Sequence, residues 1–118
     1  MTSPPQLATY QLALLRHTRP GRGFDAESRE RIFREHLAYT LSMVASGEQL
    51  AAGPVTDSPA EDEDICGLGL YQKDSLDEVR QLLANDPGVR QGLYCFDVMT
   101  WRSAPGVITP PVGWVPPV

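Results

Sequence analysis

The sequence predicts an α+β domain in which two helices pack on one four-stranded antiparallel sheet. Two amphipathic stretches with helical spacing alternate with four short apolar stretches, which glycine, proline or acidic residues separate. Their order along the chain is strand, helix, strand, strand, helix, strand. The chain has 118 residues, which is the size of one domain with a core of its own.

The first half of the chain provides the first strand and the longer helix. The apolar run 7–16 predicts a strand, and the run 17–23, which contains proline and glycine, predicts a loop. Asp25 suits the N-cap of a helix over 25–46, and Gly47 suits its end. We expect the core to receive the apolar side chains that recur at helical spacing, namely Phe33, Leu37, Leu41 and Val44.

Two short strands follow this helix, with an acidic loop between them. The run 48–54 predicts a strand, and the polar run 55–64 predicts a loop. The run 65–72 predicts a third strand. Its glycines, Gly67 and Gly69, remove side chains from one face and allow another group to pack closely there.

A second helix and a fourth strand complete the domain. The helix is expected over 75–85, because Ser75 and Glu78 have the spacing of a capping box. Its apolar stripe consists of Leu76, Val79, Leu82 and Leu83. The run 85–88 ends the helix, and the run 92–101 predicts the last strand. This order is the split βαβ, or ferredoxin-like, arrangement, with both helices on one face of the sheet.

The predicted sheet is apolar on both faces. Alternate residues of a strand point to opposite faces, and both sets are apolar here. In the first strand the two sets are Tyr10, Leu12 and Leu14, and Ala13 and Leu15. In the fourth strand they are Leu93, Cys95 and Met99, and Tyr94, Phe96 and Val98. Two helices can cover only one of these faces. We therefore expect a homodimer, in which a second copy of the chain covers the other face.

The proline-rich segment 103–118 forms a tail after the expected domain 1–102. Its apolar side chains include Val107, Ile108, Trp114 and Val115. Prolines lower the entropy that an extended segment loses on ordering, and Trp114 can bury a large apolar area. We expect this tail to pack on the dimer.

The composition argues against several classes of partner. Of the residues, 42% are hydrophobic and 21% charged, and the net charge is −5 without a basic run. This balance does not favour binding to nucleic acid or to an anionic membrane. No apolar run has the length of a transmembrane helix, and the first ten residues lack the pattern of a signal peptide. We expect a cytoplasmic protein in which Cys66 and Cys95 stay reduced.

Two ionisable residues are candidates for chemistry. His36 flanks the apolar stripe of the first helix, so its side chain should point inward or to the edge of that stripe. Asp86 precedes a proline, which biases its backbone away from the helical region. A carboxylate beside an imidazole fixes its tautomer and makes a proton-transfer pair. Spacing alone does not show that the two meet, and each also has a structural interpretation, as a buried histidine and as a turn residue.

The runs REHLAYTLSMVASGEQLAAGPVTD (34–57) and NDPGVRQGLYCFDVMTW (85–101) resemble the YCII-related family of small dimeric α/β-barrel proteins. The matching features are His36 in the first helix, Gly53-Pro54 at the end of the second strand, and Asp86-Pro87 after the second helix. The opening LALLRHTRPG also resembles the first strand and loop of the family. The resemblance covers about residues 8–102.

This resemblance implies ferredoxin-like protomers that pair sheet to sheet, with a His–Asp pair lining a pocket in each protomer. Carried over to this chain, the pair is His36 and Asp86. The well-defined chemistry in the family is lyase-like, the elimination of chloride from a chlorinated hydroxyquinol, and muconolactone isomerase, a relative by fold, also moves protons. The acidic loop 56–64 and the tail depart from compact members, so the substrate is not carried over.

Further residues are candidates for substrate binding. Arg16 can bind a carboxylate or phenolate, although a solvated strand end explains it as well. Tyr39 and Tyr71 can supply hydroxyl groups, although aromatic residues at such positions are often core. Gly53 and Pro54, which the resemblance places at the end of the second strand, are expected to line the same pocket.

No metal or cofactor is expected. The acidic residues Glu61, Asp62, Glu63 and Asp64 lack the ligand spacing of a calcium loop. His17 and His36 form no zinc pattern with either cysteine. The glycines at 67–69 lie within a strand that no suitably spaced helix follows, so they do not predict a phosphate loop. No serine or cysteine has the surroundings of a nucleophile motif.

Two classes of function therefore remain open. One is a cofactor-free enzyme that moves protons on a ring compound by elimination, isomerisation or dehydration. The other is a ligand-binding or accessory protein without catalysis, and a cofactor-independent oxygenase is a third option to which no residue points. The fold alone does not decide between them. An apolar pocket that holds His36 within hydrogen-bond reach of Asp86 favours the enzyme, and a filled core around His36 favours the binding protein.

Overall fold

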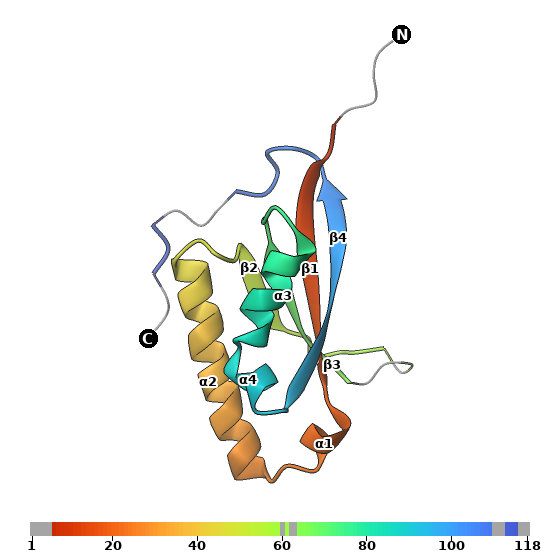
Figure 1. The fold of residues 1–118 in the computed structure, drawn as a ribbon, viewed down its shortest axis with the longest axis vertical. Helices are drawn as coiled ribbons and strands as arrows, with labels where there is room; N and C mark the ends of the chain where they lie inside the picture. The colour runs from red at the N-terminus through yellow and green to blue at the C-terminus, as the bar shows by residue number, and fades with distance from the viewer. Residues whose placement is uncertain (1–5, 60, 62–63, 110–112, 116–118) are drawn as a thin grey trace.

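The computed structural model describes residues 6–59, 61, 64–109 and 113–115. Four strands and four helices lie in these ranges (Figure 1). In chain order they are β1 (Ala8–His17), α1 (Arg19–Arg22), α2 (Ala26–Ala45), β2 (Ala51–Pro54), β3 (Ile65–Tyr71), α3 (Leu76–Ala84), α4 (Pro87–Arg90) and β4 (Tyr94–Ser103). Asp62 and Glu63 of the acidic loop, and parts of the tail, lie outside the described residues.

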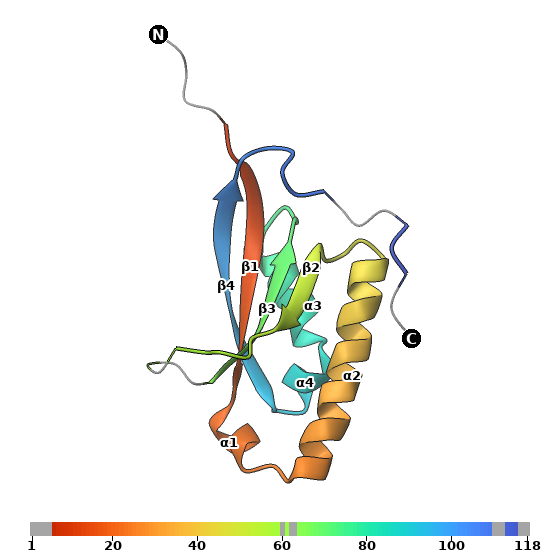
Figure 2. The ribbon, with the colours of Figure 1, turned by 180° about the vertical axis from the view of Figure 1, so that it is seen from behind.

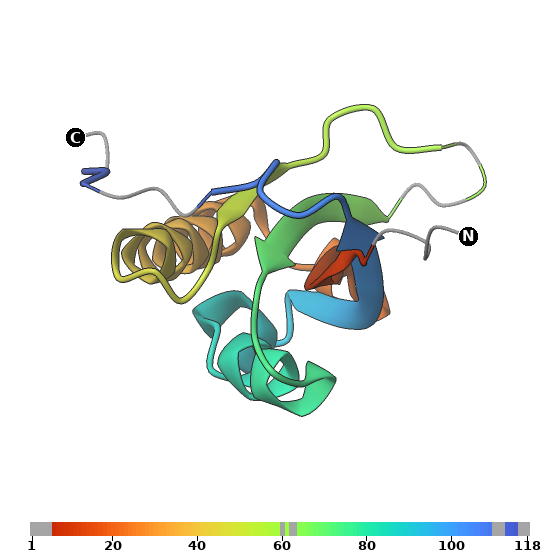
Figure 3. The same cartoon turned by 90° about the horizontal axis from the view of Figure 1, so that it is seen from above.

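The four strands form one antiparallel sheet in the order β2-β3-β1-β4. β1 is an inner strand, and its Leu15 lies opposite Gly67 on β3 and Phe96 on β4. The helices α2, α3 and α4 lie on one face of this sheet, as the two opposite views (Figures 1 and 2) and the view from above (Figure 3) show. Strand order and helix placement confirm the predicted ferredoxin-like α+β fold.

Two four-residue helices lie where the sequence predicted a loop and a helix end. The expected loop 17–23 contains α1, which Thr18 caps and which has Pro20 in its first turn. Asp86 caps α4 in the same way, with Pro87 at the first helical position. Proline favours such a start, because its backbone angle is already helical and it lacks the N–H that would otherwise need a partner.

The remaining elements lie close to their predicted ranges, and the second strand differs most. It begins at Ala51 and not at residue 48. The reason is a turn after α2, in which the backbone N–H of Gln49 donates to the carbonyl of Met43 at 3.2 Å. This turn withdraws Gln49 from the sheet and places its side chain over Gly69 of β3.

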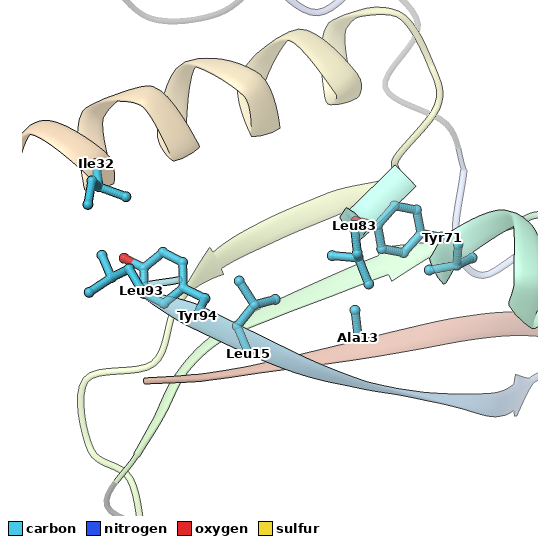
Figure 4. Packing of buried hydrophobic residues seen from close by; sticks show 8 residues of the cluster. Ala13, Leu15, Ile32, Tyr71, Leu83, Leu93 and Tyr94 are labelled. Carbon is cyan, nitrogen blue, oxygen red and sulfur yellow. The ribbon is translucent and has the colours of Figure 1, made fainter. Parts of the chain in front are cut away.

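The core lies between the sheet and the helices. Its buried apolar residues are Ala13, Leu15, Ile32, Tyr71, Val79, Leu83, Leu93 and Tyr94. Figure 4 shows Ala13 and Leu15 rising from β1 toward Leu83, with Tyr71 beside Leu83 and Tyr94 beside Leu93. Each large apolar side chain buried here contributes roughly 1.5–3 kcal/mol to stability.

The apolar stripe predicted for the first helix does not face this core. In α2 the buried residues are Ile32, Met43 and Val44, whereas Phe33 is 39% exposed and Leu37 is 40% exposed. Of the predicted stripe, only Val44 is buried. The reason is tertiary, because a pocket separates this side of α2 from the sheet and Phe33, Leu37 and Leu41 line it.

The face of the sheet that the helices do not cover is apolar. Leu68, Met99 and Trp101 are exposed large apolar side chains on β3 and β4. They lie opposite Leu14, Leu12 and Tyr10 of β1, respectively. The register thus places these six side chains side by side across three strands, with Tyr10 itself buried. Leu93, which the sequence grouped with Met99 by parity, instead lies in the core.

No described helix suits a membrane span. The longest, α2, has 20 residues but carries many charged side chains, and the other described helices are too short.

Candidate functional site

Asp86 lies between α3 and α4, and the backbone fixes its carboxylate. It has extended backbone angles (φ −63°, ψ 128°) and caps α4, where its Oδ1 accepts a hydrogen bond from Gly88 N at 2.7 Å. Its own N–H donates to the carbonyl of Leu83 at 3.0 Å. Asp86 is only 2% exposed, so this carboxylate is held in a buried position.

His36 projects from α2 and meets this carboxylate. Its Nδ1 lies 2.6 Å from Asp86 Oδ2. A carboxylate can only accept, so Nδ1 carries the proton and donates it. Nε2 is then the nitrogen of the neutral ring that can accept a proton from a ligand. The His36 side chain is 18% exposed against 3% for Asp86, so the imidazole is the member of the pair that a ligand can reach.

Two aromatic rings enclose the imidazole. Tyr94 meets His36 edge-on, with ring centroids 5.0 Å apart, and Phe33 is tilted at 6.2 Å. Tyr94 is buried at the start of β4 and also packs against Gly88 of α4. The imidazole is therefore held by the Asp86 carboxylate on one nitrogen and by aromatic packing around the ring.

The pair opens into a pocket of about 330 Å³ between α2 and the β2–β3 edge of the sheet. The pocket wall is mainly apolar and includes Leu15, Phe33, Leu37, Leu41, Val44, Leu50 and Trp114. Its polar side chains include those of His36, Asp86, Tyr39 and Gln49. Among the described residues that line the pocket, none is a lysine or arginine, and Asp86 carries the one carboxylate.

The tyrosines of the pocket stay neutral. Burial, followed by the nearby Asp86 carboxylate, raises the pKa of Tyr39, whose hydroxyl donates to the carbonyl of Leu82 at 2.6 Å. Burial also raises the pKa of Tyr71 and raises the pKa of Tyr94 to about 12. These hydroxyls are hydrogen-bonding groups, and none is a base at neutral pH.

Cys66 lines the pocket but is not an activated thiol. Burial is the main cause that raises its pKa to about 11. The thiol therefore stays protonated at neutral pH, and a protonated thiol is a poor nucleophile. Cys66 and Cys95 are both free.

The structure brings together most of the residues that the sequence singled out. His36, Asp86, Tyr39 and Tyr71 line the pocket, as does Gly53-Pro54 at the end of β2. Arg16 is not among the lining residues. Its guanidinium pairs with Asp97 of β4, at register positions on the uncovered face of the sheet. The expected contribution of Arg16 to the same site does not fit this placement.

Several residues at the site were not predicted from the sequence. Tyr94 and Gly88 pack around the pair, Gln49 contributes a buried amide, and Trp114 brings part of the tail to the pocket wall. The glycine carried a signal through its place after Asp86-Pro87, and Trp114 was expected to bury its ring, although on the dimer. Trp114 contacts the pocket of its own chain here.

A metal site has no support in the described residues. No group of three or more His, Cys, Asp or Glu side chains gathers there in an arrangement that would hold an ion. Asp64, a member of the acidic loop, instead pairs with Arg22 at the end of α1.

Comparisons with known proteins agree with this fold. The model of the YCII-related domain matches residues 11–102. A solved structure of 5-chloro-2-hydroxyhydroquinone dehydrochlorinase from Burkholderia phenoliruptrix AC1100, in complex with 2,5-dihydroxybenzoquinone, is similar at a TM-score of 0.56 and 23% identity. The match covers 78% of this chain and 92% of that chain. At this identity the likeness shows the shared fold.

A second solved structure, At3g17210 from Arabidopsis thaliana, is 12% identical with a TM-score of 0.39, over 86% of this chain and 98% of that one. Among curated proteins, none matches this chain significantly.

Proposed function

This chain belongs to the YCII-related family, and from that premise we propose that it is a cofactor-free enzyme that moves protons on a small ring compound. The observation that carries the proposal is the 2.6 Å contact between His36 Nδ1 and Asp86 Oδ2 at the wall of an apolar pocket. A buried carboxylate costs stability unless donors meet it. Here Gly88 N and the imidazole are the donors, and the imidazole remains within reach of a ligand.

The geometry suits general acid–base catalysis. Nε2 of His36 takes a proton from the bound ring compound, and the imidazolium that forms is stabilised by the Asp86 carboxylate. In an elimination, the electron pair of the broken bond to hydrogen forms the new double bond, and the leaving group departs with its own bonding pair. In an isomerisation, His36 returns the proton to a different atom of the same ring.

The size and polarity of the pocket fit this class of substrate. A volume of about 330 Å³ lies at the small end of ligand pockets and holds a single substituted ring. The aromatic and aliphatic wall excludes water from that ring, which strengthens the electrostatic interactions within the pocket. The dehydrochlorinase of similar fold acts on such a ring, and lyase chemistry of that type is our first choice here.

A substrate panel tests the proposal. The wild-type protein is mixed with 5-chloro-2-hydroxyhydroquinone and with unchlorinated hydroxylated rings and cyclic enones in D₂O. We expect release of chloride from the first, or deuterium incorporation into one of the others, measured with a chloride electrode and by proton NMR. Rings that bind in the pocket without any of these changes would instead support a ligand-binding protein.

We also propose that the protein is a homodimer through the uncovered face of the sheet. Leu68, Met99 and Trp101 expose apolar area there that a second copy of the same face would bury. The tail 103–118 would then pack along the dimer, and Trp114 already extends from it to the pocket wall.

Sedimentation velocity at micromolar concentration is expected to show the mass of a dimer. Met99→Asp places a charge in the proposed interface, and deletion of 104–118 removes the tail, so both changes should shift the protein toward the monomer. Arg34→Ala, on the solvent side of α2, is the matched control and should leave the dimer intact. A wild-type monomer, or a dimer that neither change weakens, would contradict the proposed interface.

A further inference from the structure

Gln49 is a buried amide in the turn that connects α2 to β2. It is 4% exposed and lines the pocket. Its backbone is fixed from both sides, because Gln49 N donates to Met43 O at 3.2 Å and the next residue, Leu50, donates to Leu70 O of β3 at 2.8 Å. The turn therefore holds this side chain over the edge of the sheet.

The sheet leaves room for this amide at Gly69. A Cβ added to Gly69 would lie 2.5 Å from Gln49 Nε2 and 3.8 Å from its Cδ. Any larger residue on β3 at this point would displace the amide. Gly67, the other glycine of the strand, would bring its Cβ only to an ordinary contact, 3.5 Å from Leu15 Cβ. The side chain of Gln49 thus occupies the space that a side chain at residue 69 would fill.

The protein uses little of the hydrogen-bonding capacity of Gln49. Its side chain makes one long bond among the described residues, from Nε2 to Ala51 O at 3.3 Å. The other buried glutamine, Gln11, has both ends of its amide held by the backbone of Lys73, at 2.9 and 2.6 Å. Buried amides are normally satisfied, so the remaining N–H and carbonyl of Gln49 suit a group that enters the pocket.

The spacing along α2 relates Gln49 to His36. The turn returns Gln49 to the level of Met43, seven residues beyond His36, which is roughly 10 Å along the helix axis. A six-membered ring with oxygens on opposite carbons, plus one hydrogen bond at each end, spans a similar length. In the part of the chain that the structure describes, no lysine or arginine lines the pocket to pair with an anion.

We propose that Gln49 is a specificity-determining residue, which binds a hydroxyl or keto oxygen of an uncharged ring compound whose opposite end lies at His36. This inference depends on the proposed function only for the end of the ring that reacts at His36. In it, Gln49 selects rings that carry a second oxygen, and Gly69 leaves the space that the amide needs.

Equilibrium binding tests this role without turnover. Hydroquinone, phenol, toluene and 4-hydroxybenzoate are titrated into the protein by isothermal calorimetry. The wild type is expected to bind hydroquinone more tightly than phenol or toluene, and the 4-hydroxybenzoate anion more weakly than phenol. Gln49→Met keeps the length of the side chain and removes its hydrogen bonds, so hydroquinone affinity should fall roughly five- to tenfold while toluene affinity is unchanged. Gly69→Ala should also lower the affinity for hydroquinone, because the added methyl group would displace the Gln49 amide.

Gln11→Met is the matched control, because this residue is also a buried glutamine but does not line the pocket. It should lower the thermal midpoint and leave the preference for hydroquinone unchanged. A wild type that binds phenol and hydroquinone equally would overturn the proposal. So would an equal loss for all four probes in Gln49→Met, which would identify a purely structural residue, or tight binding of 4-hydroxybenzoate.

The two proposals fail separately. If wild-type turnover is absent but Gln49→Met still removes the preference for hydroquinone, the acid–base proposal fails and the binding role stands. If turnover depends on His36 but Gln49→Met changes no affinity, the role of Gln49 fails alone.

Discussion

Replacing His36 by alanine is expected to lower turnover of the ring substrate roughly 100- to 10,000-fold, which is the usual contribution of a general acid or base. The imidazole is the basic group of the pair that a ligand can reach, since Asp86 is buried beneath it. Cys66 and the three tyrosines of the pocket, Tyr39, Tyr71 and Tyr94, all have raised pKa values and do not replace it. Steady-state kinetics with whichever compound the substrate panel identifies provides the measurement.

Asp86→Asn is also expected to lower turnover strongly, but by a smaller factor than His36→Ala. The asparagine keeps an oxygen that can accept the hydrogen bond from Gly88 N. Its NH₂ group would face Nδ1 of His36 and favour the tautomer with the proton on Nε2, where the ring cannot act as a base. Catalysis falls because the productive tautomer becomes rare, yet the imidazole itself remains.

The purely structural interpretation of the pair makes a different prediction. It requires both substitutions to lower the thermal midpoint without a selective loss of activity. Arg34→Ala, two residues before His36 and exposed on α2, is the control for the helix and should leave both activity and stability near wild type. Full turnover in a folded His36→Ala protein would rule out the acid–base role.

Replacing Gly88 by alanine is expected to destabilise the domain by about 3 kcal/mol, the upper part of the usual range for overpacking. The added Cβ would lie 2.3 Å from Cδ2 and 2.7 Å from Cε2 of Tyr94, and 3.3 Å from Asp86 Oδ1. Tyr94 is only 6% exposed, so its ring has little space into which to move. Because the same ring packs on His36, binding of hydroquinone should weaken as well.

Gly23→Ala is the matched control for this stability prediction. Its backbone angle is negative (φ −88°), and its Cβ would approach nothing closer than Pro20 O at 3.5 Å. Urea denaturation should therefore show a change of less than about 1 kcal/mol. Tyr94→Leu should relieve part of the clash, so the double variant Gly88→Ala with Tyr94→Leu is expected to lose less stability than the sum of the single changes. Equal stability of the two alanine variants would contradict the close packing at Gly88.

The sequence was sufficient for the order and type of the main elements. Apolar periodicity located α2 and α3, and Asp25 and Ser75 marked their starts, where the structure has them as N-caps. Glycine, proline and acidic residues separated the strands, so the ferredoxin-like order followed. Proline was misread at α1 and α4, because a residue that is typical of loops and helix ends also favours the first turn of a helix.

The same distinction between sequence and tertiary structure applies to the functional site. The sequence by itself determined which side chains could do acid–base chemistry, and it singled out His36 and Asp86 through helical position and the Asp-Pro turn. Only the tertiary structure decided that these side chains, fifty positions apart, meet at 2.6 Å, and that Gln49 lies over Gly69. It also turned Phe33 and Leu37 toward a pocket and not into the core. Periodicity specifies the side of an element on which a residue lies, whereas the packing of distant elements specifies what that side faces.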